Sequence, residues 1–215
     1  MASGTDASAE AQVRHHALRL LAVAQTGLTY GSDPFDQQRY AETRQIGLAL
    51  LALVTHGGAA ELEPIVACDR GYATPKVDVR AAVFDDRQRI LLIQERSDRR
   101  WTLPGGWSDV LETPSQAVIR EAREEAGVVV DVVKLAAVLD RERQGNQPPL
   151  PFHVYQLFFL CRQVSVGDPL PTETLDVQWF DVDRLPPLSV SRVTGHQIRL
   201  LHAHHLHPQR PTTFD

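Results

Sequence analysis

The stretch that decides the fold runs from Gly106 to Val128 and reads GWSDVLETPSQAVIREAREEAGV. It contains the signals of a helix start, because Thr113, Pro114 and Gln116 form a capping box. The first turn of a helix leaves its backbone N–H groups unpaired, so a proline that lacks this group is tolerated there. Gly127 can adopt the left-handed conformation that ends a helix. The sequence therefore predicts a helix that ends just before Gly127.

Three glutamates gather on one face of this predicted helix. Residues three and four positions apart share a helical face, so Glu121, Glu124 and Glu125 converge. Like charges at this spacing destabilise a helix, and arginines or a divalent cation can offset the repulsion. Carboxylate oxygens suit Mg²⁺ or Mn²⁺ rather than zinc. A solvated acidic face paired with arginine is the alternative. The preceding loop, residues 103–106, favours a metal, because its glycines let the backbone approach a ligand closely.

The same stretch resembles the Nudix box, whose pattern is G-x5-E-x7-R-E-U-x-E-E-x-G-U with U an apolar residue, and it meets every specified position. The resemblance implies an α/β fold, an α/β/α sandwich around a mixed sheet. It implies hydrolysis of a nucleoside diphosphate linked to another moiety, with Mg²⁺ or Mn²⁺ as cofactor. It also implies that Glu121 and Glu125 are metal ligands, that Glu124 is a ligand or lies beside one, and that the carbonyl of Gly105 is a further ligand.

The resemblance also suggests catalytic roles. Arg120 is expected to orient a box glutamate through a bidentate pair rather than to touch the substrate. Glu112 is either a structural residue, the interpretation we favour, or a metal partner. In this family the base that takes a proton from the attacking water is often a glutamate outside the box. Glu173 is the candidate base here, with a plain surface residue as the alternative, and Glu124 is the second choice.

Aromatic and basic residues near the box are candidates for substrate binding. Trp101 and Trp107 flank the glycine loop and could stack on a base, although each could instead pack in the core. Arg80 is a candidate for contact with phosphate or ribose. A cluster of histidines near the C-terminus is interpreted as a polar helix end rather than a zinc site, because no cysteine or carboxylate completes a recognisable spacing. These are His202, His204, His205 and His207.

The N-terminal part predicts one helix over residues 10–25, ended by Thr26 and Gly27, and a second over about 36–55. Two helices of this size cannot bury both of their apolar faces alone. The N-terminal part resembles the helical extension of a Nudix subgroup that includes CDP-choline and ADP-ribose pyrophosphatases, in which the extension takes part in dimerisation. The segments that carry this resemblance are AQTGLTYGSDPFDQQRY and GYATPKVDVR. We therefore expect a dimerising helical hairpin over residues 1–58, a linker over 59–75 and a Nudix domain over 76–215.

Within that domain, residues 76–84 and 89–94 flank an Asp-Asp turn and predict a β-hairpin. Three further strands and a final helix are expected after the box. Their predicted ranges are 128–138, 153–162 and 177–180 for the strands, and 190–204 for the helix.

Composition narrows the class of protein and its partners. The chain has 215 residues and a formal net charge of −5, which argues against a broad surface for nucleic acid or anionic membranes. The apolar run 48–55 is too short to span a bilayer, and the N-terminus lacks the pattern of a secretory signal. Cys68 and Cys161 lie far apart and are interpreted as reduced thiols. We expect a cytoplasmic homodimer that joins through its N-terminal helices.

The leading functional prediction is a metal-dependent pyrophosphatase for a small nucleoside diphosphate derivative of the CDP-choline or ADP-ribose type. Removal of diphosphate from RNA 5′ ends or from nucleoside triphosphates is the alternative, and the net negative charge weakens its RNA version. A non-catalytic ligand sensor is a third possibility. A sensor has no need of every box carboxylate, and this chain has all of them.

Overall fold

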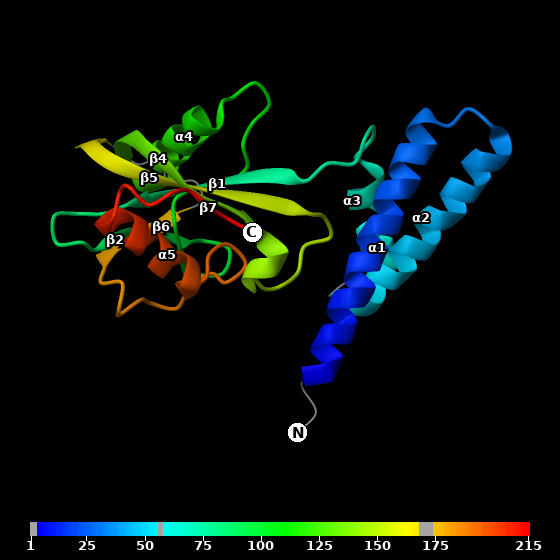
Figure 1. Ribbon diagram of the computed structural model, residues 1–215, viewed down its shortest axis with the longest axis horizontal. Coiled ribbons are helices and arrows are strands. Elements are labelled where there is room, and N and C mark those ends of the chain that lie inside the picture. Colours follow the sequence, from blue (N-terminus) through cyan, green and yellow to red (C-terminus); the bar gives the residue numbers. More distant parts are fainter. Residues whose placement is uncertain (1–3, 56–57, 168–173) are drawn as a thin grey trace. The chain divides into compact units, whose positions relative to one another are not determined.

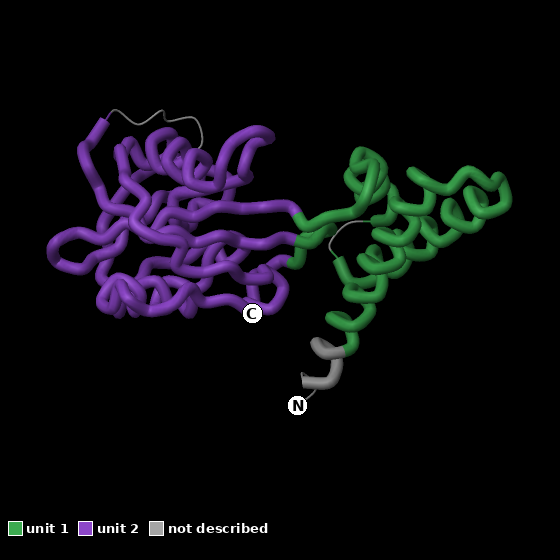
Figure 2. The backbone as a smooth tube through the Cα atoms, turned by 45° about the horizontal axis from the view of Figure 1, so that its top comes forward, with its two compact units in different colours: residues 1–75, 149–153 green, residues 76–148, 154–215 purple. Residues whose placement is uncertain are grey.

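The computed structural model describes residues 4–55, 58–167 and 174–215. The chain divides into two compact units, which Figure 2 shows in separate colours. The N-terminal unit comprises Met1–Pro75 together with Pro149–His153, and the C-terminal unit comprises Lys76–Pro148 and Val154–Asp215.

The N-terminal unit is built on two long helices that pack side by side, α1 (Gly4–Tyr30) and α2 (Pro34–Val54) (Figure 1). The expected end of the first helix at Gly27 is wrong, because α1 continues for three further residues. Gly27 is a packing glycine, since a Cβ there would lie 2.4 Å from the ring of Tyr40 on α2. The side chain of Asp33 caps α2 by accepting hydrogen bonds from two backbone N–H groups of its first turn.

A third helix, α3 (Ala59–Ala67), lies within the stretch that was expected to be a linker. It forms because Leu62 is buried in the apolar cluster of this unit, which gives a short helix the tertiary packing that it needs. The buried members of this cluster are Ala17, Leu21, Leu48, Leu51 and Leu62.

The C-terminal unit contains two sheets. The first is mixed and has the strand order β1-β5-β4-β7, in which β1 is parallel to β5 and β4 is antiparallel to it. The second has the order β3-β2-β6 and is antiparallel. The strands are β1 (Lys76–Val83), β2 (Ile90–Glu95), β3 (Trp101–Thr102), β4 (Val128–Asp140), β5 (Val154–Val166), β6 (Thr174–Phe180) and β7 (Thr213–Phe214).

The predicted hairpin between the first two strands is wrong, because β1 and β2 belong to different sheets. They share an isolated bridge between Phe84 and Ile90, after which the chain crosses from one sheet to the other. One edge of β1 pairs with β5, and its other edge holds the loop before the box. Both hydrogen-bonding edges of β1 are thus in use. Alternation of apolar residues predicted these two strands correctly but could not identify their partners. It did not predict the two-residue strands β3 and β7.

Two helices cover opposite faces of the strands, α4 (Pro114–Ala126) and α5 (Gly195–Leu206) (Figure 1). Neighbouring residues of a strand point to opposite faces. On β1, accordingly, Ala81 packs in the apolar cluster of α4 and Ala82 in that of α5. The predicted α/β/α sandwich and its N-terminal helical hairpin are confirmed. The final helix begins at Gly195 rather than near residue 190, because Thr194 and Gln197 form its capping box.

In the described part of the chain, none of the helices is both long and apolar enough to cross a bilayer. A short 3-10 helix, η1 (Arg141–Gln144), follows β4.

Candidate active site

The helix that carries the acidic face is fixed at both ends by the residues that the sequence indicated. The hydroxyl of Thr113 accepts from the backbone N–H of Gln116, whose side chain accepts from the Thr113 N–H at 2.9 Å. Gly127 ends the helix with a φ of 63°, in the left-handed region. Buried Ala117 and Ala122 turn the opposite face of α4 toward the strands. The glutamates are therefore held on a helix whose register is set by its core.

The glycine loop before the box lies along the edge of β1 that does not pair with β5. The carbonyls of Pro104 and Gly106 each accept a hydrogen bond from β1 at 2.8 Å. Between them Gly105 has a φ of +146°, and a Cβ there would lie 2.0 Å from the carbonyl oxygen of Val79. A side chain therefore cannot replace the hydrogen at this position without displacing the loop. The backbone N–H of Gly105 donates to Glu125 Oε2 at 2.7 Å, which joins the loop to α4.

Arg120 contacts three box glutamates. Its guanidinium donates to both carboxylate oxygens of Glu112, at 2.9 and 3.1 Å. It also donates to Glu121 at 2.8 Å and to Glu124 at 3.1 Å. Hydrogen bonding from Arg120 holds the pKa of Glu112 below its usual value. The guanidinium thus fixes the directions in which these carboxylates point.

Burial raises the pKa values of Glu121 and Glu125. It raises the pKa of Glu125 to about 7, although the Gly105 N–H and the Arg80 charge act in the opposite direction. It also raises the pKa of Glu121, and the hydrogen bond from Arg120 partly offsets this effect. Both charged forms are therefore costly in the absence of a cation.

The donor set fits a hard divalent cation. Arg120 pairs with three of the four box glutamates, so its single positive charge cannot balance their negative charge. The four are Glu112, Glu121, Glu124 and Glu125. Mg²⁺ and Mn²⁺ favour oxygen ligands of this kind. Among the residues that the structure describes, no group of three or more His, Cys, Asp or Glu side chains is already arranged around a metal position. A cation would therefore compete with Arg120 for Glu121 and Glu124.

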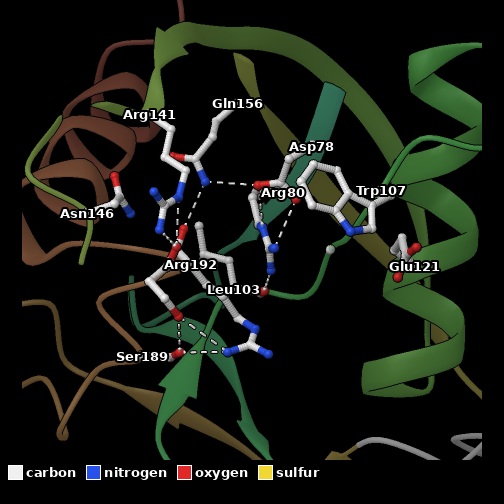
Figure 3. A network of polar contacts seen from close by, with 12 residues as sticks. Asp78, Arg80, Leu103, Trp107, Glu121, Arg141, Asn146, Gln156, Ser189 and Arg192 are labelled. Carbon is white, nitrogen blue, oxygen red and sulfur yellow. Dashed lines mark hydrogen bonds and ion pairs between the residues drawn. The ribbon is translucent and has the colours of Figure 1, made fainter. Parts of the chain in front are cut away.

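The proposed substrate-binding residues are in three different environments. Arg80 is buried and pairs with Asp78 through two hydrogen bonds, at 2.9 and 3.1 Å. Trp101 is buried in the apolar cluster of α5 and packs edge-on against Phe180, which favours the core-packing alternative. Trp107 is 47% exposed and lies at the end of the glycine loop (Figure 3). Of the three, Trp107 presents the most surface to a ligand.

Two other predictions concern the candidate base and the histidines near the C-terminus. Glu173, the candidate base, lies outside the described residues. The histidines of α5 do not share one environment. His204 is buried and lies 2.9 Å from the hydroxyl of Thr213, whereas the ring of His205 stacks on Phe84. Both side chains pack near the end of α5, and the burial of His204 differs from the exposed polar helix end that was expected.

Sequence analysis did not identify the buried polar network beside the glycine loop (Figure 3). Asp78 and Gln156 lie opposite each other on β1 and β5 and are joined by a hydrogen bond of 2.8 Å. Both are nearly inaccessible to solvent. The available signal was a polar residue inside each apolar strand, in VDVRAAV and VYQLFFL. Buried polar groups of this kind need partners, so the two residues together indicate a buried polar contact.

Comparison with known proteins identifies the family. Residues 74–201 match the model of the NUDIX domain. The chain belongs to the Nudix family. Residues 11–66, before the Nudix domain, match the model described as a UDP-X-like, N-terminal oligomerisation domain. The predicted Nudix subgroup with a helical N-terminal extension is thereby confirmed.

Two of the relatives described here match nearly the whole of this Nudix protein, and a third matches about two thirds of it. A putative ADP-ribose pyrophosphatase, YjhB of Bacillus subtilis, is 36% identical over 93% of this chain and 95% of its own. The crystal structure of an ADP-ribose pyrophosphatase from Streptococcus suis is 36% identical, covers 66% of this chain and 100% of its own, and superposes with a TM-score of 0.60. A crystal structure of UDP-X diphosphatase is 30% identical and superposes with a TM-score of 0.61. The match covers 96% of this chain and 99% of the diphosphatase. The enzyme prediction, a Nudix pyrophosphatase, is confirmed.

Proposed function

We propose that this Nudix pyrophosphatase uses Mg²⁺ or Mn²⁺ to hydrolyse the pyrophosphate bond of a nucleoside diphosphate linked to a second moiety, of the CDP-choline or ADP-ribose type. The observation that carries the proposal is the complete acidic face of α4, held against the glycine loop by the bond from Gly105 to Glu125. The relatives support the substrate class, because those that match over their full length are named for ADP-ribose or for UDP-X.

The residues of the acidic face and the glycine loop would have separate roles in metal binding and orientation. A bound cation supplies charge neutralisation at the diphosphate and lowers the pKa of a coordinated water. Glu121, Glu124, Glu125 and the backbone of Gly105 would hold it. Arg120 keeps Glu121 and Glu124 on the same side of the helix, through contacts of 2.8 and 3.1 Å. It acts by orienting these carboxylates rather than by contact with the substrate.

Proton removal from the attacking water requires a carboxylate that is ionised and can be reached. Glu173 remains the first candidate for this base. Glu124 is the second, because its side chain is 44% exposed whereas that of Glu121 is 12% exposed. Trp107 would contact the base or the second moiety of the substrate, since its ring is half exposed at the edge of the glycine loop.

The proposal includes a homodimer that forms through the N-terminal unit. The match to an oligomerisation domain supports it, as do large apolar side chains that this unit leaves exposed, among them Val23, Phe35 and Leu53. We also propose a reducing, cytoplasmic location. Cys68 and Cys161 are both free thiols, and burial raises the pKa of the Cys161 thiol to about 12, which makes it unreactive.

A substrate panel tests the proposed function. Purified full-length protein is incubated with Mg²⁺ or Mn²⁺ and CDP-choline, ADP-ribose, a UDP-sugar, NADH, a diadenosine polyphosphate or a nucleoside triphosphate, and products are resolved by anion-exchange chromatography. We expect kcat/KM to be highest for one of the first three compounds. Glu124→Gln protein is the matched control for contaminating activity. Turnover of triphosphates alone, or no turnover in the presence of bound metal, would contradict the proposal.

A further inference from the structure

The buried polar network beside the glycine loop forms a continuous path to the acidic helix. It starts at α5, where Gln197 donates to the side-chain oxygen of Gln156 at 3.0 Å. The amide nitrogen of Gln156 donates to Asp78 at 2.8 Å, and also to the backbone carbonyl of Arg192 at 2.9 Å. All polar atoms of the Gln156 amide group therefore have defined partners, and the side chain has one orientation.

The next link in the path is the pair of Asp78 and Arg80. Asp78 Oδ2 accepts from Gln156 and from Arg80 Nε, and its other oxygen accepts from Arg80 Nη2. The bidentate pair fixes the plane of the guanidinium. Its remaining nitrogen, Nη1, is thereby directed to the carbonyl of Leu103, which it reaches at 3.2 Å. Leu103 is the first residue of the glycine loop, so this hydrogen bond from Arg80 holds the start of the loop in place.

Arg80 also supports the loop by direct packing. A Cβ built on Gly105 would lie 2.9 Å from Cα of Arg80 and 3.0 Å from its Cδ. The backbone of Gly105 thus rests on Arg80, and its N–H is held in the direction that meets Glu125 at 2.7 Å. Figure 3 shows Gln156, Asp78, Arg80 and Leu103 in this sequence. A substitution at Gln156 can therefore shift the loop through Asp78 and Arg80, although Gln156 does not itself contact the acidic face.

We propose that Gln156 is a positioning residue: through Asp78 and Arg80 it sets the position of the glycine loop, and with it the geometry in which Gly105 and the box glutamates receive a divalent cation. The inference rests on the proposed function in that it assumes a metal at this face. Residues that orient metal ligands from outside the ligand set commonly change metal affinity by about 10–100-fold when they are replaced.

A simpler account must be excluded by experiment. Buried polar groups that lose a partner destabilise a protein, so the alternative is that Gln156 serves stability alone. That account predicts that its replacement lowers the free energy of unfolding and leaves the metal site of the folded protein intact. The positioning role predicts a weaker metal site in protein that remains folded.

Direct Mn²⁺ binding to the full-length protein, measured by electron paramagnetic resonance, separates the two accounts. The test variant is Gln156→Met, which keeps the length of the side chain and removes its hydrogen bonds. The matched control is Leu201→Ala, which removes buried volume from α5 and involves no residue of the network. Urea unfolding places both variants on the same stability scale.

We expect the dissociation constant for Mn²⁺ to rise roughly tenfold in Gln156→Met and to stay within about twofold of the wild-type value in Leu201→Ala. Equal binding in the wild type and in Gln156→Met overturns the positioning role. If Gln156→Met does not fold, Arg80→Lys tests the next link, because lysine keeps the charge but cannot reach Asp78 and Leu103 together. Unchanged Mn²⁺ binding there would also overturn it. Absence of Mn²⁺ binding in the wild-type protein would refute the proposed function as well. That result differs from failure of the positioning role alone, in which the wild type and the variant bind Mn²⁺ equally.

Discussion

Replacement of Glu125 by glutamine should stabilise the metal-free protein while it removes activity. Glu125 is largely buried, and burial raises its pKa to about 7. Glutamine has the same shape and carries no charge, and its side-chain oxygen can still accept the hydrogen bond from Gly105. The substitution therefore removes the cost of a buried charge and keeps the contact between loop and helix. Without the carboxylate, the proposed metal site loses a ligand.

The magnitude and its pH dependence follow from the shifted pKa. An unperturbed glutamate has a pKa of about 4.3, and each unit of difference corresponds to about 1.4 kcal/mol. With a folded-state pKa of about 7, ionised Glu125 therefore costs about 4 kcal/mol. Because the folded state binds this proton more tightly than the unfolded state, the contribution of Glu125 to stability is full below about pH 4 and is lost as the pH rises through about 7. The advantage of the variant should be small near pH 4 and greatest near pH 8.

The assay is urea unfolding of both proteins in EDTA at a series of pH values. At pH 8 the variant should unfold with a free energy about 4 kcal/mol higher than that of the wild type, and the gap should close as the pH falls. Glu124→Gln is the control. Its side chain is 44% exposed, so its replacement removes no comparably buried charge and we expect no comparable gain in stability. A variant no more stable than the wild type at pH 8, or a gap that does not change with pH, would refute the reasoning.

Three further predictions follow from the site and the N-terminal unit. Gly105→Ala should lower the free energy of unfolding by about 2 kcal/mol or more in urea titration, because the new Cβ meets the Val79 carbonyl; wild-type stability would show that the loop adapts. Arg120→Lys should reduce kcat by roughly tenfold with little change in the urea midpoint, because lysine cannot form the bidentate pair with Glu112; an unchanged kcat would remove the orienting role. Deletion of residues 1–67 should convert a dimer to a monomer in sedimentation velocity, because it removes α1, α2 and α3. A truncated protein that sediments as a dimer would contradict this.

Part of the site was predictable because its signals are local. The capping box at Thr113, the glycine stop at Gly127 and the spacing of the glutamates each depend on a few neighbouring residues, and the helix has the predicted bounds. The fold class was predictable for a related reason, since the box occurs within a fixed order of strands and helices. Gly27 shows the limit. It was interpreted as a helix stop, but its real role is to admit the ring of Tyr40 from another helix.

The sequence by itself determined which helix carries the carboxylates, which family the box resembles and where an added helical unit precedes it, because short-range spacing and backbone preference decide these features. Only the tertiary structure decided that β1 and β2 enter different sheets and that Trp101 lies in the core. It alone placed Gln156 beside Asp78, 78 residues away in the chain. The physical reason is that partners across a sheet are selected by packing and burial over the whole unit, and no local pattern of residues records that selection.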